Sequence, residues 1–235
     1  MKVTLLSFTP QPELVIATAA RLSTSKVSAK ELGERLSSEQ VNSLLEQLLS
    51  AGHLSPFEHA SFTFAIDGIS RACSHQLVRH RLASYTQQSQ RYVSLRDLNY
   101  VTPNTIASKP EIKAKFQEMV QAAHELYSQM LEAGIPAEDA RYVLPQAIET
   151  KLVMTMNARE LMHACSLRLC QRAQWEIREL FGQIKREVEK VAPYLGSKLR
   201  PKCYNLGYCN ERESCGLFPT REEAERQGLI ISKSK

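Results

Sequence analysis

Two short apolar segments with the period of a β-strand limit the folds open to this chain. From Ser61 to Asp67 apolar side chains alternate with smaller or polar ones, and residues 152–156 repeat the alternation. A helix is predicted to follow each strand, over about 69–80 and about 158–170. Helices following short strands predict an α/β or α+β fold, in which several helices pack on a small sheet.

Helix signals surround these strands. Ser37 and Gln40 form a capping box ahead of an apolar stripe that stops at Gly52, which predicts an amphipathic helix. Pro110 suits the first turn of a long helix that should end near Gly134.

The rest of the chain predicts one domain. A shorter helix is expected between Pro136 and Pro145, and another over about 173–191. Since no repeat or long linker interrupts the 235 residues, we predict one compact domain over 1–192 and an irregular tail over 193–235. No strand opens onto a Gly-x-Gly-x-x-Gly loop, so a Rossmann dinucleotide site is not indicated.

Charge and hydropathy narrow the class of protein. Lysine and arginine number 30 against 25 acidic residues, and the formal charge of +5 suits anionic ligands without making the chain polybasic. No window approaches the roughly 20 apolar residues of a membrane-spanning helix. We therefore expect a cytoplasmic protein with no membrane partner.

The six cysteines are too sparse for a disulfide scaffold in a chain of this length. Three stand among apolar helical neighbours and are predicted to pack in the core: Cys73, Cys165 and Cys170. The other three are spaced evenly in the tail: Cys203, Cys209 and Cys215. The tail could bind zinc, but it has no Cys-x-x-Cys knuckle and no fourth ligand, so we predict no metal site.

Residues 76–92 concentrate the polar chemistry. Arg79, His80, Arg81 and Arg91 fall within thirteen residues that contain no acid, and hydroxyl and amide side chains stand between them. Arginine matches phosphate oxygens with two hydrogen bonds, so the segment predicts a site for a phosphate-rich ligand. The alternative is a solvated basic helix face.

A second basic group lies downstream. Arg141 is expected on the short helix, and Asn157 and Arg159 follow the second strand. His163 is an i, i+4 neighbour of Arg159, whereas Arg168 lies about two and a half helical turns beyond Arg159. Each of these arginines taken alone could be a surface charge.

Together these segments resemble the flavin-dependent thymidylate synthases. The family signature is matched by Arg79-His80-Arg81, seven further residues and Ser89. Supporting segments occur in the family order at residues 20–23, 52–59, 140–145, 157–159 and 167–178. The resemblance implies that the predicted domain over 1–192 is the catalytic domain of such an enzyme.

The resemblance also implies the ligands and the residues that hold them. Family members are homotetramers whose sites are shared between subunits, with FAD lying over dUMP. FAD would be contacted by Ser55, Arg79, His80, Arg81, Gln87, Asn157, Ala158, Arg159 and His163. The nucleotide would be held by Gln76, Leu77, Val78, Arg79, Gln87, Gln88, Ser89, Gln90, Arg91, Arg141 and Arg168.

The implied reaction is the reductive methylation of dUMP to dTMP. Methylenetetrahydrofolate would donate the carbon, reduced FAD the hydride, and NADPH would reduce the flavin. Arg168 is the implied catalytic residue, because its charge near the uracil ring favours the anionic imide and makes carbon 5 more nucleophilic.

Two alternatives to this enzyme stay open. One is a basic module that binds nucleic acid without catalysis, although no nucleic-acid partner is expected if the resemblance holds. The other is a flavin oxidoreductase without methyl transfer. It is kept open because many family members have Asn and Glu where this chain has Thr86 and Gln87, and an amide cannot act as a base.

Overall fold

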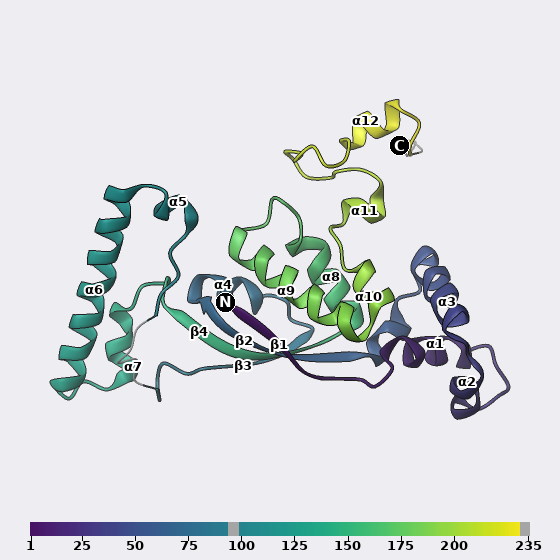
Figure 1. Ribbon diagram of the computed structural model, residues 1–235, viewed down its shortest axis with the longest axis horizontal. Helices are drawn as coiled ribbons and strands as arrows, with labels where there is room; N and C mark the ends of the chain where they lie inside the picture. The colour runs from purple at the N-terminus through teal and green to yellow at the C-terminus, as the bar shows by residue number, and fades with distance from the viewer. Residues whose placement is uncertain (94–98, 231–235) are drawn as a thin grey trace. The chain divides into compact units, whose positions relative to one another are not determined.

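The computed structural model describes residues 1–93 and 99–230 and contains a four-stranded sheet in the order β1-β2-β4-β3 (Figure 1). The strands are β1 (Lys2–Phe8), β2 (Ser61–Ser70), β3 (Ala83–Gln87) and β4 (Glu149–Asn157). The predicted class, several helices with a small sheet, is confirmed.

Backbone hydrogen bonds show that the central strands are antiparallel. The Arg71 amide donates to the Ile148 carbonyl at 3.0 Å, and the Ala158 amide donates to the Ala60 carbonyl at 2.7 Å. The start of β4 therefore lies beside the end of β2, and the end of β4 beside the start of β2.

The two predicted strands bury their apolar residues as the alternation requires. On β2 the side chains of Phe62, Phe64 and Ile66 are fully buried, and on β4 Leu152, Met154 and Met156 are at most 4% exposed. Residues between them are half-buried or exposed, so one face of each strand carries the core.

Clustering of contacts divides the chain into two compact units. The first contains residues 1–4 and 64–154, and the second contains 5–63 and 155–235. The division passes through β1, β2 and β4. The boundary predicted between residues 192 and 193 stays a prediction, and residues 231–235 of the predicted tail lie outside the described part of the chain.

The first unit carries the long predicted helix. Its helices are α4 (Arg71–Leu77), α5 (Asn104–Ala107), α6 (Pro110–Glu132), α7 (Ala137–Ala140) and the 3-10 helix η2 (Arg141–Val143). α6 begins at Pro110 as predicted, buries Val120 and Tyr127, and packs against α5, α7 and η2. α4 is shorter than the predicted 69–80, because β2 continues to Ser70 and the Ser70 hydroxyl caps the helix at the Cys73 amide.

The second unit is mainly helical. It contains α1 (Pro12–Leu22), α2 (Ala29–Arg35), α3 (Ser38–Ala51), η1 (Ser55–His59), α8 (Ala158–Arg168), α9 (Trp175–Val191), α10 (Pro193–Lys198), α11 (Cys203–Leu206) and α12 (Arg221–Arg226). The predicted capping box of Ser37 and Gln40 is present, and Gly52 ends α3 in the left-handed conformation. Helix α9 contributes a fully buried stripe formed by Ile177, Leu180, Phe181, Ile184 and Val188.

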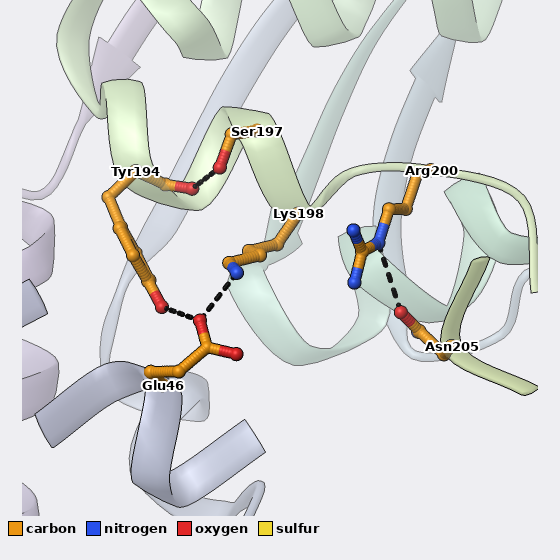
Figure 2. A network of polar contacts seen from close by, with 6 residues as sticks. All are labelled: Glu46, Tyr194, Ser197, Lys198, Arg200 and Asn205. Atoms are coloured by element: carbon orange, nitrogen blue, oxygen red, sulfur yellow. Dashed lines mark hydrogen bonds and ion pairs between the residues drawn. The ribbon is translucent and has the colours of Figure 1, made fainter. Parts of the chain in front are cut away.

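Helix α10 is held by a carboxylate on α3 (Figure 2). The Tyr194 hydroxyl and the Lys198 ammonium, at 2.5 Å, both donate to Glu46 Oε2. The lysine, followed by the tyrosine, lowers the pKa of Glu46, so the carboxylate stays ionised at neutral pH. Beyond α10, Arg200 Nε donates to Asn205 Oδ1 at 3.1 Å and connects the chain to α11.

Some elements were not predicted. β1 and α1 share an apolar N-terminal run, and β3 lies in a stretch of polar residues without an apolar period. In the described ranges, no helix combines the length and apolar character needed to span a bilayer.

Two glycines in the helical pair α9 and α10 should respond oppositely to alanine. A Cβ at Gly196 would lie 2.8 Å from Glu189 Cα, whereas a Cβ at Gly182 would meet Arg186 Nη1 at 3.8 Å, an ordinary contact. We expect Gly196→Ala to lower the free energy of unfolding by about 1–3 kcal/mol. Gly182→Ala should raise it by about 0.5–1 kcal/mol. Thermal and urea unfolding at equal protein concentration measure both, and shifts in the same direction would contradict this packing.

Candidate active site

The turn after α4 separates a buried histidine from two exposed arginines. His80 is 5% exposed, while Arg79 and Arg81 on either side are exposed. The Tyr85 hydroxyl on β3 lies 2.9 Å from the Leu77 carbonyl and 3.0 Å from the His80 carbonyl. The Tyr85 hydroxyl and the burial of His80 therefore hold the turn in place. The guanidinium-bearing residues Arg79 and Arg81 stay exposed to solvent.

These two arginines are available to an anion. Within residues 1–93 and 99–230, neither Arg79 nor Arg81 has an ion pair or a side-chain hydrogen bond. Phosphate oxygens match the planar guanidinium with paired hydrogen bonds. The turn therefore presents two exposed guanidinium groups, and the phosphate site stays a prediction.

Gln87 at the end of β3 is anchored to two buried hydroxyl groups. Its Nε2 donates to Ser74 Oγ at 3.0 Å and to Thr150 Oγ1 at 3.1 Å. Ser74 is fully buried and Thr150 is 3% exposed. The Gln88 amide donates to the Lys151 carbonyl at 2.9 Å. Residues 83–87 therefore form a strand that is held to α4 and β4, an element that the sequence did not predict.

Arg91 and Arg141, fifty residues apart, meet at Glu138. Arg91 forms an ion pair with that carboxylate, and Arg141 Nε donates to the Glu138 backbone carbonyl at 2.9 Å. Arg141 begins η2 rather than lying on the short helix α7 as predicted. The acid missing from the signature segment in sequence is thus supplied to Arg91 by the tertiary structure.

Arg71 is a basic residue that the sequence reasoning missed. It starts α4 and is half-buried, and burial followed by the positive charge of Arg141 lowers the pKa of its guanidinium. Arginine remains a cation in proteins, so two neighbouring guanidinium groups repel each other until an anion approaches. The only sign of Arg71 in the sequence is its position, eight residues before the basic cluster that begins at Arg79.

The remaining predicted nucleotide contacts of this unit lie on α4 and after β3. Gln76 is half-buried and Val78 exposed, whereas Leu77 is fully buried and uses its carbonyl for Tyr85. Ser89 Oγ accepts from the Arg91 amide at 3.1 Å, and Ser89 and Gln90 are half-buried.

The second unit gathers its predicted residues around the start of α8. Asn157 caps the helix by accepting from the Glu160 amide at 2.9 Å, and Ala158 is buried. Arg159 is paired with Glu58 of η1 at 2.5 Å, close to the exposed Ser55.

Two further predicted residues lie along α8. His163 is exposed, one turn after Arg159, and Arg168 is the half-buried last residue of the helix. The predicted residues thus form one cluster in each compact unit, and their roles as ligand contacts stay predictions.

Comparison with known proteins identifies the family. The family model described as "Thymidylate synthase complementing protein" matches residues 4–194. A flavin-dependent thymidylate synthase of Geobacter sulfurreducens is 50% identical over 213 residues, covering 90% of this chain and 91% of the relative. The chain belongs to the flavin-dependent thymidylate synthase family, as its signature predicted. It is therefore an enzyme, and the non-catalytic binding module is not supported.

Other relatives agree over most of the chain. A flavin-dependent thymidylate synthase of Pyrococcus abyssi is 45% identical over 241 residues, with 99% of each chain covered. Among solved structures, the UMP/dUMP methylase PolB from Streptomyces cacaoi, bound with 5-Br dUMP, superimposes with a TM-score of 0.73. It is 27% identical, and the match covers 84% of this chain and 93% of PolB.

The anchoring of Gln87 predicts the effect of placing a carboxylate at this position. A carboxylate cannot donate to Ser74 and Thr150, and the Ser74 hydroxyl already donates to the Arg71 carbonyl at 3.0 Å. Gln87→Glu should therefore lose a buried hydrogen bond and lower the free energy of unfolding by about 1–3 kcal/mol.

Gln88→Glu is the matched control, because the described structure gives its side chain no hydrogen bond. It should change stability by less than about 0.5 kcal/mol in the same thermal unfolding experiment. A Gln87→Glu protein as stable as the unmodified one would show that the two hydroxyl groups do not depend on the amide.

Proposed function

We propose that the protein converts dUMP to dTMP by reductive methylation, using the methylene carbon of methylenetetrahydrofolate. FAD, reduced by NADPH, supplies the hydride when it is bound, and the protein supplies binding, orientation and electrostatics. Family membership supports the reaction class, and the observation that carries the ligand chemistry is the exposed Arg79 and Arg81 pair without acidic partners among the described residues.

The donor groups of the first unit fit phosphorylated ligands. Arg79 and Arg81 offer two guanidinium groups, and Arg71 beside Arg141 forms a second place where cations accumulate. dUMP and FAD both bring phosphate charges, which would relieve this repulsion. Arg141 and Arg91, already oriented by Glu138, would hold the nucleotide together with the predicted residues 87–90.

The family resemblance supports the residues proposed to hold FAD. His80 would contribute from its buried position after α4, with Arg79, Arg81 and Gln87. In the second unit the contacts would come from Ser55, from residues 157–159 at the start of α8, and from His163.

Ser89 is proposed to bind the nucleotide rather than attack it. Its hydroxyl oxygen accepts from the Arg91 amide, which leaves the hydroxyl proton to be donated to a ligand. Within residues 1–93 and 99–230, no hydrogen bond joins the Ser89 side chain to a histidine or a carboxylate, and an unassisted serine is a weak nucleophile.

Arg168 is proposed as the catalytic residue. A guanidinium beside the uracil imide would stabilise negative charge on the ring and so increase electron density at carbon 5. No enzyme thiol is then required to activate the pyrimidine. We further propose a homotetramer with sites shared between subunits, and the cytoplasm stays the expected compartment.

The first test is the cofactor and product of the purified protein. We expect a yellow tetramer whose absorption spectrum shows FAD, and dTMP should form only with dUMP, methylenetetrahydrofolate and NADPH together. NADPH oxidation without dTMP would instead establish a flavin oxidoreductase. A colourless protein that fails to take up added FAD would overturn the proposal.

The second test separates binding from activation. In single turnover from pre-reduced enzyme, Arg168→Ala should slow dTMP formation by about 10² to 10³. Ser89→Ala should slow it much less, and both should retain FAD that NADPH reduces. Arg186→Ala, which removes an exposed arginine of α9 paired with Glu179, is the control. A dead Ser89→Ala protein together with a trapped dUMP adduct on Ser89 would identify the serine as the nucleophile.

A further inference from the structure

Four of the six cysteines line one pocket in the second unit. The pocket has a volume of about 130 Å³ and lies between the chain after α8 and the segment 201–218. Its thiols are Cys170, Cys203, Cys209 and Cys215. Cys73 and Cys165 are fully buried as predicted, but Cys170 is half-buried beyond the end of α8, which corrects its assignment to the core.

The tertiary structure supplies the fourth cysteine that the tail lacks in sequence. The Lys202 amide donates to the Ser166 carbonyl of α8 at 3.1 Å, which brings the following Cys203 toward Cys170. All four thiols, those of Cys170, Cys203, Cys209 and Cys215, line the same pocket, so they lie near one another. Cys209 is held in turn by its amide, which donates to the Pro219 carbonyl at 2.7 Å.

The tail has little apolar material with which to stabilise itself. Over the described residues 199–230, the buried positions are Leu199, Cys209 and Ala224. Its helices α11 and α12 have four and six residues. Segments with so small a core are commonly stabilised by disulfides or a structural metal, and the matched family model ends at residue 194, before this segment.

The pocket lining carries charges of both signs. Two cations, Arg172 and Lys202, and one acid, Glu211, line the pocket, and the cations would partly offset the net charge of about −2 that four thiolates on a divalent ion carry. Each is paired with an acid of the tail, Arg172 with Glu213 at 2.6 Å and Lys202 with Glu211 at 2.5 Å.

The thiols must still approach one another to share an ion. Throughout residues 1–93 and 99–230, no three potential ligands already stand at the spacing of a metal site. Three of the four thiols lie on the tail, where Gly207 and Gly216 adopt left-handed turns. Metal binding is commonly coupled to local folding in structural zinc sites, so we expect the tail to close around the ion as it binds.

We propose that Cys170, Cys203, Cys209 and Cys215 bind one Zn²⁺ ion as four thiolates, which fixes the C-terminal segment to the end of α8. Each thiol releases its proton to water as its zinc–sulfur bond forms, and no oxidation is involved. Sulfur ligands disfavour Mg²⁺ and Ca²⁺, and a closed set of four leaves the ion no catalytic position.

Metal analysis of the full-length, untagged protein tests the site independently of thymidylate synthesis. Elemental mass spectrometry of protein purified under reducing conditions should find about one zinc ion per chain. Cys170→Ser and Cys209→Ser should each weaken zinc binding by at least about tenfold in competition with a chelator. Cys73→Ala and Cys165→Ala, which remove buried thiols outside the pocket, should retain the ion.

A second measurement uses the unmodified protein, so it does not depend on how the variants fold. Removal of zinc by a chelator should accelerate tryptic cleavage after Lys202 and Arg212, and added Zn²⁺ should reverse the effect. Reduced protein that contains no zinc and takes up none would overturn the proposal. So would iron with the colour of an iron–sulfur cluster, disulfides among these cysteines in protein kept reduced, or zinc retained by both serine variants.

Discussion

The buried apolar faces of β2 and β4 are the constraint on which the rest of this structure depends. Both strands pass through both compact units, and each carries alternate side chains that are almost fully buried. The catalytic candidates extend directly from the ends of these strands. α4 follows β2, and α8 follows β4, so the register that buries Phe64 and Met154 also determines where the two helices begin.

Around that framework, residues 79–91 divide into those whose side chains hold the backbone and those whose side chains stay exposed. Tyr85 and Gln87 use their polar groups inside the protein, on carbonyl and hydroxyl partners of α4 and β4. The guanidinium groups of Arg79 and Arg81 form no ion pair or hydrogen bond with the described residues. Anchored side chains alternate with exposed ones along β3, and the anchored ones hold the turn that carries Arg79 and Arg81.

The basic residues differ in whether a carboxylate of the protein neutralises their charge. Arg91 and Arg159 have carboxylate partners, which orient their side chains before any ligand binds. Arg71 and Arg141 instead face each other's charge. An anion placed near them would relieve that repulsion, which supports the phosphate contacts proposed for Arg141.

The sequence by itself determined the elements whose signals are local. The capping box before α3, the proline that begins α6 and the alternation along β2 and β4 depend on side chains within a few residues, and the structure has all of them. The arginine-histidine-arginine signature likewise identified the family. Helix ends were predicted less well, because the cap on Ser70 and the Gln174 side chain, which accepts from two amides, moved the starts of α4 and α9.

Only the tertiary structure decided which distant residues meet. β3 was not predicted because its polar side chains carry no apolar period, and it forms a strand through pairing with β4. Glu138 reaches Arg91, Thr150 reaches Gln87, and Cys170 joins the cysteines of the tail across segments of tens of residues. Such pairings depend on how the chain folds back on itself. A pattern among neighbouring residues does not indicate which residues far apart in the sequence will meet.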